Sequence, residues 1–213
     1  MPASADWPAV YAILDAEACR ARHLTPIAVL RAWLDAGITL IQLRAKTLPT
    51  ADLCTLGAEA VALTRGRARL TINDRADVAA VVGADGVHVG QDDLPPEAVR
   101  ALLGPHALIG LSTHSVAQAE AALSAPIDYL AIGPVFETGS KDTGYRPLGL
   151  ETVRAVCDLA RRRAVPVVAI GGITRERAAA VRDCGVSSVC AIGALLEDES
   201  PGTAATRFLD ASR

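Results

Sequence analysis

Short apolar runs alternate with longer helical patterns along the whole of this 213-residue chain. The apolar runs, eight in number, predict strands at Val10–Leu14, Thr39–Leu43, Leu70–Ile72, Gly86–Val89, Leu108–Leu111, Tyr129–Ile132, Val165–Ile170 and Ser188–Ala191. The segments between and after them predict helices at Pro26–Asp35, Ala51–Thr64, Ala76–Val82, Pro96–Leu102, Val116–Leu123, Leu150–Arg161, Arg175–Asp183 and Ala204–Ala211. Strict alternation is typical of βαβ units with parallel strands, and continuous apolar runs indicate strands buried on both faces. The pattern predicts an α/β protein, a (β/α)8 TIM barrel that forms a single domain over residues 1–213.

The same elements could instead form an open, doubly wound sheet. That fold usually carries a G-x-G-x-x-G sequence directly after its first strand. No such sequence follows the run that ends at Leu14. We therefore favour the closed barrel and keep the open sheet as the alternative.

Charge and hydropathy exclude several classes of protein. The formal net charge is −3, and the longest basic run is Arg161–Arg163, which argues against a nucleic-acid surface. No apolar stretch reaches the length of a membrane span, and residues 1–6 do not resemble a secretory signal. We expect a cytoplasmic protein with neither nucleic acid nor membrane as a partner, and its oligomeric state stays open. The five cysteines show no metal-like spacing and are expected to be buried, reduced thiols.

The basic residues are unusual because 19 of the 21 are arginine, and only Lys46 and Lys141 are lysine. Chemistry in such barrels lies at the carboxyl ends of the strands. Alternation along the second strand places Gln42 and Arg44 on one side, with Lys46 just beyond the strand end. Two cations and an amide that converge on the barrel mouth would bind a phosphate or diphosphate. A solvated cluster of loop charges is the alternative.

Carboxylates follow the third and fourth strands, which are neighbours in a barrel. Asp74 follows the third strand and Asp92 and Asp93 follow the fourth. Mg²⁺ binds one or two carboxylates together with water and substrate phosphates, so one carboxylate from each strand could share this cation. Helix N-capping is the alternative for each residue taken alone.

The later strand ends carry features of anion sites. Ser112 precedes a predicted helix start, where anions bind well. The polar loop 133–144 holds the second lysine and has the composition of a mobile substrate loop. Glycines after the seventh and eighth strands, at 171–172 and 193, would let backbone N–H groups approach a phosphate.

Motifs in every quarter of the chain resemble those of the thiamine-phosphate synthase family. They are the segments 41–46 (IQLRAK), 73–75 (NDR), 86–95 (GVHVGQDDLP), 110–114 (GLSTH), 133–136 (GPVF) and 169–173 (AIGGI). The resemblance runs from about residue 9 to 210. It implies a Mg²⁺-dependent transferase that joins hydroxymethylpyrimidine diphosphate to a thiazole phosphate, commonly its carboxylated form with loss of CO₂, and releases diphosphate.

The resemblance also implies roles for individual residues. The pyrimidine diphosphate would be held by Gln42, Leu43, Arg44, Ala45, Lys46, Asn73, Ser112 and Lys141. The thiazole phosphate would be held by Thr138, Gly139, Ser140, Gly172, Ile192 and Gly193. Asp74 and Asp93 would ligate Mg²⁺, while Arg44, Lys46, Lys141 and Ser112 would act on the departing diphosphate. Three positions depart from the family pattern: Ala45 replaces an acidic residue, Gly139–Ser140 a bulkier pair, and Gly193 a frequent serine.

Two other functions fit parts of the same pattern. The thiazole tautomerase family has a loop after the sixth strand that is similar to residues 136–138 of this chain. That family, however, has a histidine at the position of Pro134, and it does not carry the carboxylate pair. A catalytically silent phosphate-binding barrel would have no need of the complete charged set. No general base is required for diphosphate departure, so we assign no catalytic role to His88 or His114 and expect His88 to pack at its strand end.

Overall fold

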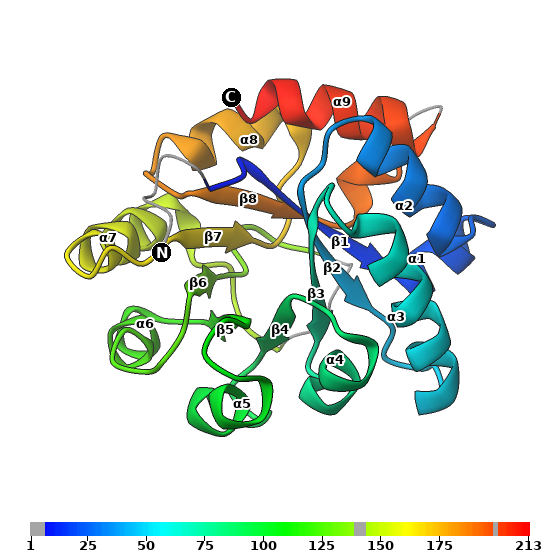
Figure 1. Ribbon diagram of the computed structural model, residues 1–213. Helices are drawn as coiled ribbons and strands as arrows, with labels where there is room; N and C mark the ends of the chain where they lie inside the picture. Colours follow the sequence, from blue (N-terminus) through cyan, green and yellow to red (C-terminus); the bar gives the residue numbers. More distant parts are fainter. Residues whose placement is uncertain (1–6, 139–143, 198–199) are drawn as a thin grey trace.

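Figure 1 shows the computed structural model of the chain, in which residues 7–138, 144–197 and 200–213 are described. Eight parallel strands form a closed barrel in the order of the sequence, and the first strand pairs with both the second and the eighth. The strands are β1 (Val10–Asp15), β2 (Leu40–Arg44), β3 (Arg69–Asn73), β4 (Gly86–Val89), β5 (Leu108–Thr113), β6 (Tyr129–Ile132), β7 (Val167–Ile170) and β8 (Ser188–Ala191). The predicted barrel is confirmed, and the β1–β8 pairing excludes the open sheet.

Strand boundaries differ from the prediction by one or two residues. β7 begins at Val167, whereas the apolar run begins at Val165. Pro166 has no N–H to donate to a neighbouring strand, although its carbonyl accepts from the Leu130 N–H at 2.9 Å. β1 extends one residue further than predicted, to Asp15.

Helices surround the barrel on the outside (Figure 1). They are α1 (Ala16–Ala21), α2 (Pro26–Asp35), α3 (Thr50–Thr64), α4 (Ala76–Val82), α5 (Pro96–Leu103), α6 (Val116–Ala122), α7 (Gly149–Arg161), α8 (Arg175–Arg182) and α9 (Pro201–Ala211), with a short 3-10 helix η2 (Gly193–Leu195). All eight predicted helices are present. The sequence did not predict α1, which is only six residues long and begins where the Asp15 carboxylate accepts from the Ala18 N–H at 2.7 Å.

Apolar side chains form two layers because successive strand residues point to opposite faces. The larger layer lies between the strands and the helices and includes the buried Trp33 and Phe208. The smaller layer fills the barrel interior, where Tyr11 and Tyr129 are the largest members. These two side chains fill the barrel near the amino ends of the strands, so the open space lies toward the carboxyl ends.

The sequence also predicts buried, reduced cysteines and no membrane span. All five cysteines lie in the described residues, none is in a disulfide, and four are buried. Among the described residues, no helix is both long and apolar enough to span a bilayer.

Candidate active site

A cavity of about 260 Å³ opens at the carboxyl ends of the strands. It brings together residues from most of the barrel that the sequence placed in one site. The predicted residues that line it are Gln42, Arg44, Asn73, Ser112, Thr138, Gly172, Ile192 and Gly193. The position agrees with the general location of chemistry in this fold.

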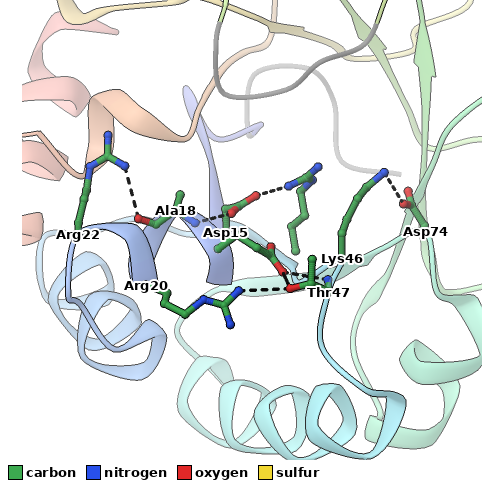
Figure 2. A network of polar contacts seen from close by, with 9 residues as sticks. Asp15, Ala18, Arg20, Arg22, Lys46, Thr47 and Asp74 are labelled. Carbon is green, nitrogen blue, oxygen red and sulfur yellow. Dashed lines mark hydrogen bonds and ion pairs between the residues drawn. The ribbon is translucent and has the colours of Figure 1, made fainter.

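Arg44 is the cation that enters the cavity from β2. Its guanidinium forms an ion pair with the Asp15 carboxylate at the end of β1, the strand that pairs with β2. The other Asp15 oxygen caps α1, so this carboxylate is held from both sides (Figure 2). The Arg44 side chain is only 12% exposed, and its Nε has no hydrogen-bond partner among the described residues. Arg44 is therefore a nearly buried cation with donor capacity left for an anion.

Lys46 lies at the rim in the loop after β2 and is 51% exposed. Its neighbour Thr47 anchors this loop to α1. The Thr47 N–H and hydroxyl donate to Glu17 Oε1 at 2.9 and 2.7 Å, and Arg20 donates to the Thr47 hydroxyl at 3.2 Å. Figure 2 shows Lys46 reaching from this anchored loop toward Asp74, with Nζ 3.5 Å from Oδ2.

Asp74 and Asp93 lie close together at the same rim. Asp74 follows β3 in a left-handed conformation with φ of 62°, and its N–H donates to the His88 carbonyl at 2.8 Å. Asp93 accepts from the Gly90 N–H at 2.7 Å. Burial raises the pKa of the Asp74 carboxyl, the neighbouring Asp93 raises it further, and Lys46 opposes both effects. The fold thus holds two carboxylates against their mutual repulsion.

This carboxylate pair could supply two of the oxygen ligands of a Mg²⁺ ion. Its donors are hard oxygens from two adjacent strand ends. Burial and then repulsion by Asp93 raise the Asp74 pKa, and a divalent cation would relieve that repulsion. Residues 7–138, 144–197 and 200–213 contain no cluster of three or more His, Cys, Asp or Glu side chains suited to a metal. A cation at the pair would complete its coordination with water and substrate oxygens, as Mg²⁺ usually does.

Ser112 is held by a chain of hydrogen bonds that runs into the barrel. Its hydroxyl lies 2.8 Å from His88 Nε2, and His88 Nδ1 lies 2.9 Å from the Tyr129 hydroxyl. Tyr129 continues to Tyr11 at 2.8 Å, and Tyr11 accepts from Gln42 Nε2 at 2.9 Å. Burial raises the pKa of both phenols above the usual range, so both stay protonated and available as donors. His88 was expected to pack at its strand end, and there it also orients Ser112.

The opposite side of the cavity is formed by backbone. Gly172 has a φ of 61°, and a Cβ there would overlap the Glu137 carbonyl oxygen and lie 2.8 Å from Phe136 Cβ. The loop after β7 therefore packs directly on the loop after β6, which only glycine allows. Gly193 begins η2 at the end of β8 and lines the cavity beside Ile192. We call this region, formed by Thr138, Gly172, Ile192 and Gly193, the phosphate cup, after the role that the motif resemblance implies for it.

Some predicted residues lie elsewhere. The Leu43 side chain is buried between the strands and the helices, on the face of β2 opposite to Gln42, and Ala45 packs against the same layer. Neither side chain is among the described residues that line the cavity. The same holds for Lys46, Asp74 and Asp93, which follow the ends of β2, β3 and β4. Gly139, Ser140 and Lys141 lie outside the described residues, so their predicted roles stay predictions.

Several site residues were not anticipated. Asp15 directly follows the first apolar run, so the strand-end rule that found Asp74 would also have found it. Tyr11 and Tyr129 lie within strands, where the apolar pattern predicts core residues and no functional role. Arg177, on α8, also lines the cavity, and nothing in the sequence distinguishes it from the other arginines of that helix.

The chain matches known proteins along nearly all of its length. The sequence profile of the family described as "Thiamine monophosphate synthase" matches residues 10–195. The chain belongs to the thiamine monophosphate synthase family. It is 42% identical over 203 residues to the thiamine-phosphate synthase of a Roseiflexus species, covering 95% of this chain and 84% of that relative.

Other relatives extend this likeness. The chain is 45% identical over 190 residues to the thiamine biosynthesis bifunctional protein ThiM/ThiE of Symbiobacterium thermophilum, covering 89% of this chain and 39% of that longer protein. Among solved structures, the thiamine phosphate pyrophosphorylase from Pyrococcus furiosus aligns with a TM-score of 0.85 and 33% identity over 96% of this chain and 95% of that one. Family membership makes the chain an enzyme, a transferase, as the resemblance of its motifs implied.

Proposed function

We propose that this enzyme joins hydroxymethylpyrimidine diphosphate to a thiazole phosphate, with release of diphosphate. One observation carries the proposal. A single cavity has Arg44 on one side, with Lys46 and Asp74 just beyond the neighbouring strand ends, and a glycine-lined cup on the other side, so it offers separate places for a diphosphate and a monophosphate.

The charged rim suits a dissociative displacement. The bond between the pyrimidine methylene carbon and the diphosphate oxygen breaks, and its electron pair leaves with the diphosphate. The thiazole nitrogen then donates its lone pair to the benzylic-type cation and forms the new C–N bond. Arg44 and Lys46 would hold the leaving anion, because each can place positive charge where negative charge develops.

The carboxylate pair and the polar chain have complementary roles. Asp74 and Asp93 would hold Mg²⁺, which supplies further positive charge opposite the diphosphate. Gln42 and Ser112, fixed by Tyr11 and His88, present polar groups from the barrel wall that would orient the pyrimidine diphosphate. Holding both substrates in one cavity lowers the entropic cost of their encounter.

The test is formation of thiamine phosphate by the purified chain from the two substrates, with and without Mg²⁺, followed by chromatography. We expect product only when both substrates and the cation are present. Aromatisation of the thiazole without pyrimidine diphosphate or metal would instead favour the tautomerase. Binding of both phosphorylated compounds without product would favour the silent barrel.

A further inference from the structure

The phosphate cup contains no cation of its own. The side chains of Thr138, Gly172, Ile192 and Gly193 are neutral, and two carboxylates, Glu137 and Glu197, line the same cavity. A phosphate monoester carries close to two negative charges at neutral pH. Neutral donors beside two carboxylates would attract such a group weakly, so a positive charge near the cup would strengthen its binding.

Arg177 lies where that charge is needed. It is the third residue of α8, which begins directly after the loop that holds Gly172. Among the described residues that line the cavity, the only guanidinium groups are those of Arg44 and Arg177. Arg44 is already paired with Asp15, and it enters from β2 rather than from the β7 end of the cavity.

Two contacts hold the Arg177 side chain at the cup. Its Nη1 donates to the Gly172 carbonyl at 2.9 Å, and its guanidinium carbon lies 4.5 Å from the centre of the Phe136 ring. The guanidinium carries five N–H donors, of which the Gly172 carbonyl takes one, and the contact with the aromatic ring uses none of them. The loops after β6 and β7 thus fix the plane of a cation that keeps donors for a ligand.

We propose that Arg177 is a substrate-binding residue that contacts the phosphate of the thiazole substrate and sets the preference of the enzyme for the phosphorylated thiazole over its alcohol. This inference rests on the proposed function, which supplies the identity of the monophosphate. Arginine suits the position better than lysine because a planar guanidinium can stack on Phe136 and donate from its edge at the same time.

The test compares Arg177→Gln with Arg175→Gln. Both variants remove one arginine from the first turn of α8, but Arg175 pairs with Glu176 and is not among the described residues that line the cavity. Steady-state kinetics would give KM for each substrate, and titration calorimetry would give the affinity of the unaltered protein and each variant for the thiazole phosphate and for the thiazole alcohol.

For Arg177→Gln we expect at least a tenfold rise in KM and Kd for the thiazole phosphate. The KM for the pyrimidine diphosphate and the Kd for the thiazole alcohol should stay within twofold, and Arg175→Gln should leave all four values unchanged. Arg177→Lys, which keeps the charge without the stacked plane, should lie between Arg177→Gln and the unaltered protein.

Equal rises in KM for both substrates would show that Arg177 only holds two loops together, and so would a rise in KM that parallels a fall in melting temperature. Either result would overturn the proposal. Absence of thiazole phosphate binding to the unaltered protein would also overturn it. If the unaltered protein binds the thiazole phosphate but forms no thiamine phosphate, the proposed function fails while calorimetry still decides the role of Arg177.

Discussion

The two proposed anion sites differ in how they are built. The rim at the ends of β1 to β4 consists of charged side chains that the fold holds close together: Arg44 with Asp15, and Lys46 with Asp74 beside Asp93. The phosphate cup consists mainly of closely packed backbone, because Gly172 lies where no other residue fits. Substitutions of Lys46, Asp74 or Asp93 should therefore change activity with little effect on stability, whereas a substitution in the cup should change stability first.

Asp93→Asn tests the charged rim most severely. The substitution keeps an oxygen for the Gly90 N–H but removes a charge next to Asp74. In the proposed Mg²⁺ site, loss of the Asp93 ligand would cost several kcal/mol of transition-state stabilisation, so we expect kcat/KM for the pyrimidine diphosphate to fall about a hundredfold. The melting temperature should be unchanged or higher, because a like-charge contact is gone.

The matched control is Asp92→Asn, which alters the adjacent carboxylate. Asp93 accepts the Gly90 N–H, so we expect activity in Asp92→Asn to stay close to that of the unaltered protein. Equal losses in the two variants would mean that the choice of Asp93 over Asp92 is wrong.

Gly172→Ala tests the cup. A Cβ at this left-handed position would collide with Glu137 backbone, so the loops after β6 and β7 would have to separate. Gly66→Ala is the control, since Gly66 has a similar φ of 73° and nothing within 4 Å of an added Cβ. We expect Gly66→Ala to lower the free energy of unfolding by about 1 kcal/mol from backbone strain alone.

Because of this collision, we expect Gly172→Ala to lower the free energy of unfolding by about 2 kcal/mol more than Gly66→Ala does, as measured by urea denaturation. Equal values for the two variants would show that the cup is loosely packed and would weaken the contrast between the two sides.

Lys46→Arg asks whether the rim needs a compact cation. Only two of the 21 basic residues are lysine, and both, Lys46 and Lys141, fall in loops with a predicted diphosphate role. An ammonium is a compact point charge, while a guanidinium is planar and larger, so we expect turnover to fall at least about tenfold in Lys46→Arg and in Lys141→Arg. Circular dichroism should show an intact fold, and near-normal turnover in both would make the retained lysines a coincidence.

The smallest expected effect is on stability as a function of pH. Burial and then Asp93 raise the pKa of Asp74 in the folded protein above its value in the unfolded chain. The folded state then binds more protons than the unfolded state, so this group makes stability fall as pH rises from about 3.9 to the raised value.

Asp74→Asn removes this dependence. The stability of the variant relative to the unaltered protein should therefore increase across that pH range and level off above it. Urea denaturation at several pH values would measure the difference, and a relative stability that is flat or falls with pH would contradict the proposed repulsion at the rim.

Much of the fold and part of the site could be predicted from the sequence. The alternation of apolar runs and helical segments was enough to favour the barrel, because buried parallel strands and the helices that cover them each have a characteristic local pattern in the sequence. Polar residues at the ends of β2 to β5 could be assigned to the barrel mouth, and Gln42, Arg44, Asn73 and Ser112 do line the cavity. The short helix α1 was missed because six residues carry too little periodicity to detect.

The sequence by itself determined the succession of strands and helices along the chain, the side of β2 on which Gln42 and Arg44 lie, and the ends of the strands at which polar groups gather. Only the tertiary structure decided which of those groups meet. The pairing of Arg44 with Asp15, the proximity of Asp74 and Asp93, and the placement of Arg177 on Phe136 all join residues from different βα units. Their side chains meet because the barrel closes and the loops pack on one another, and distances set by closure leave no trace in local composition or periodicity.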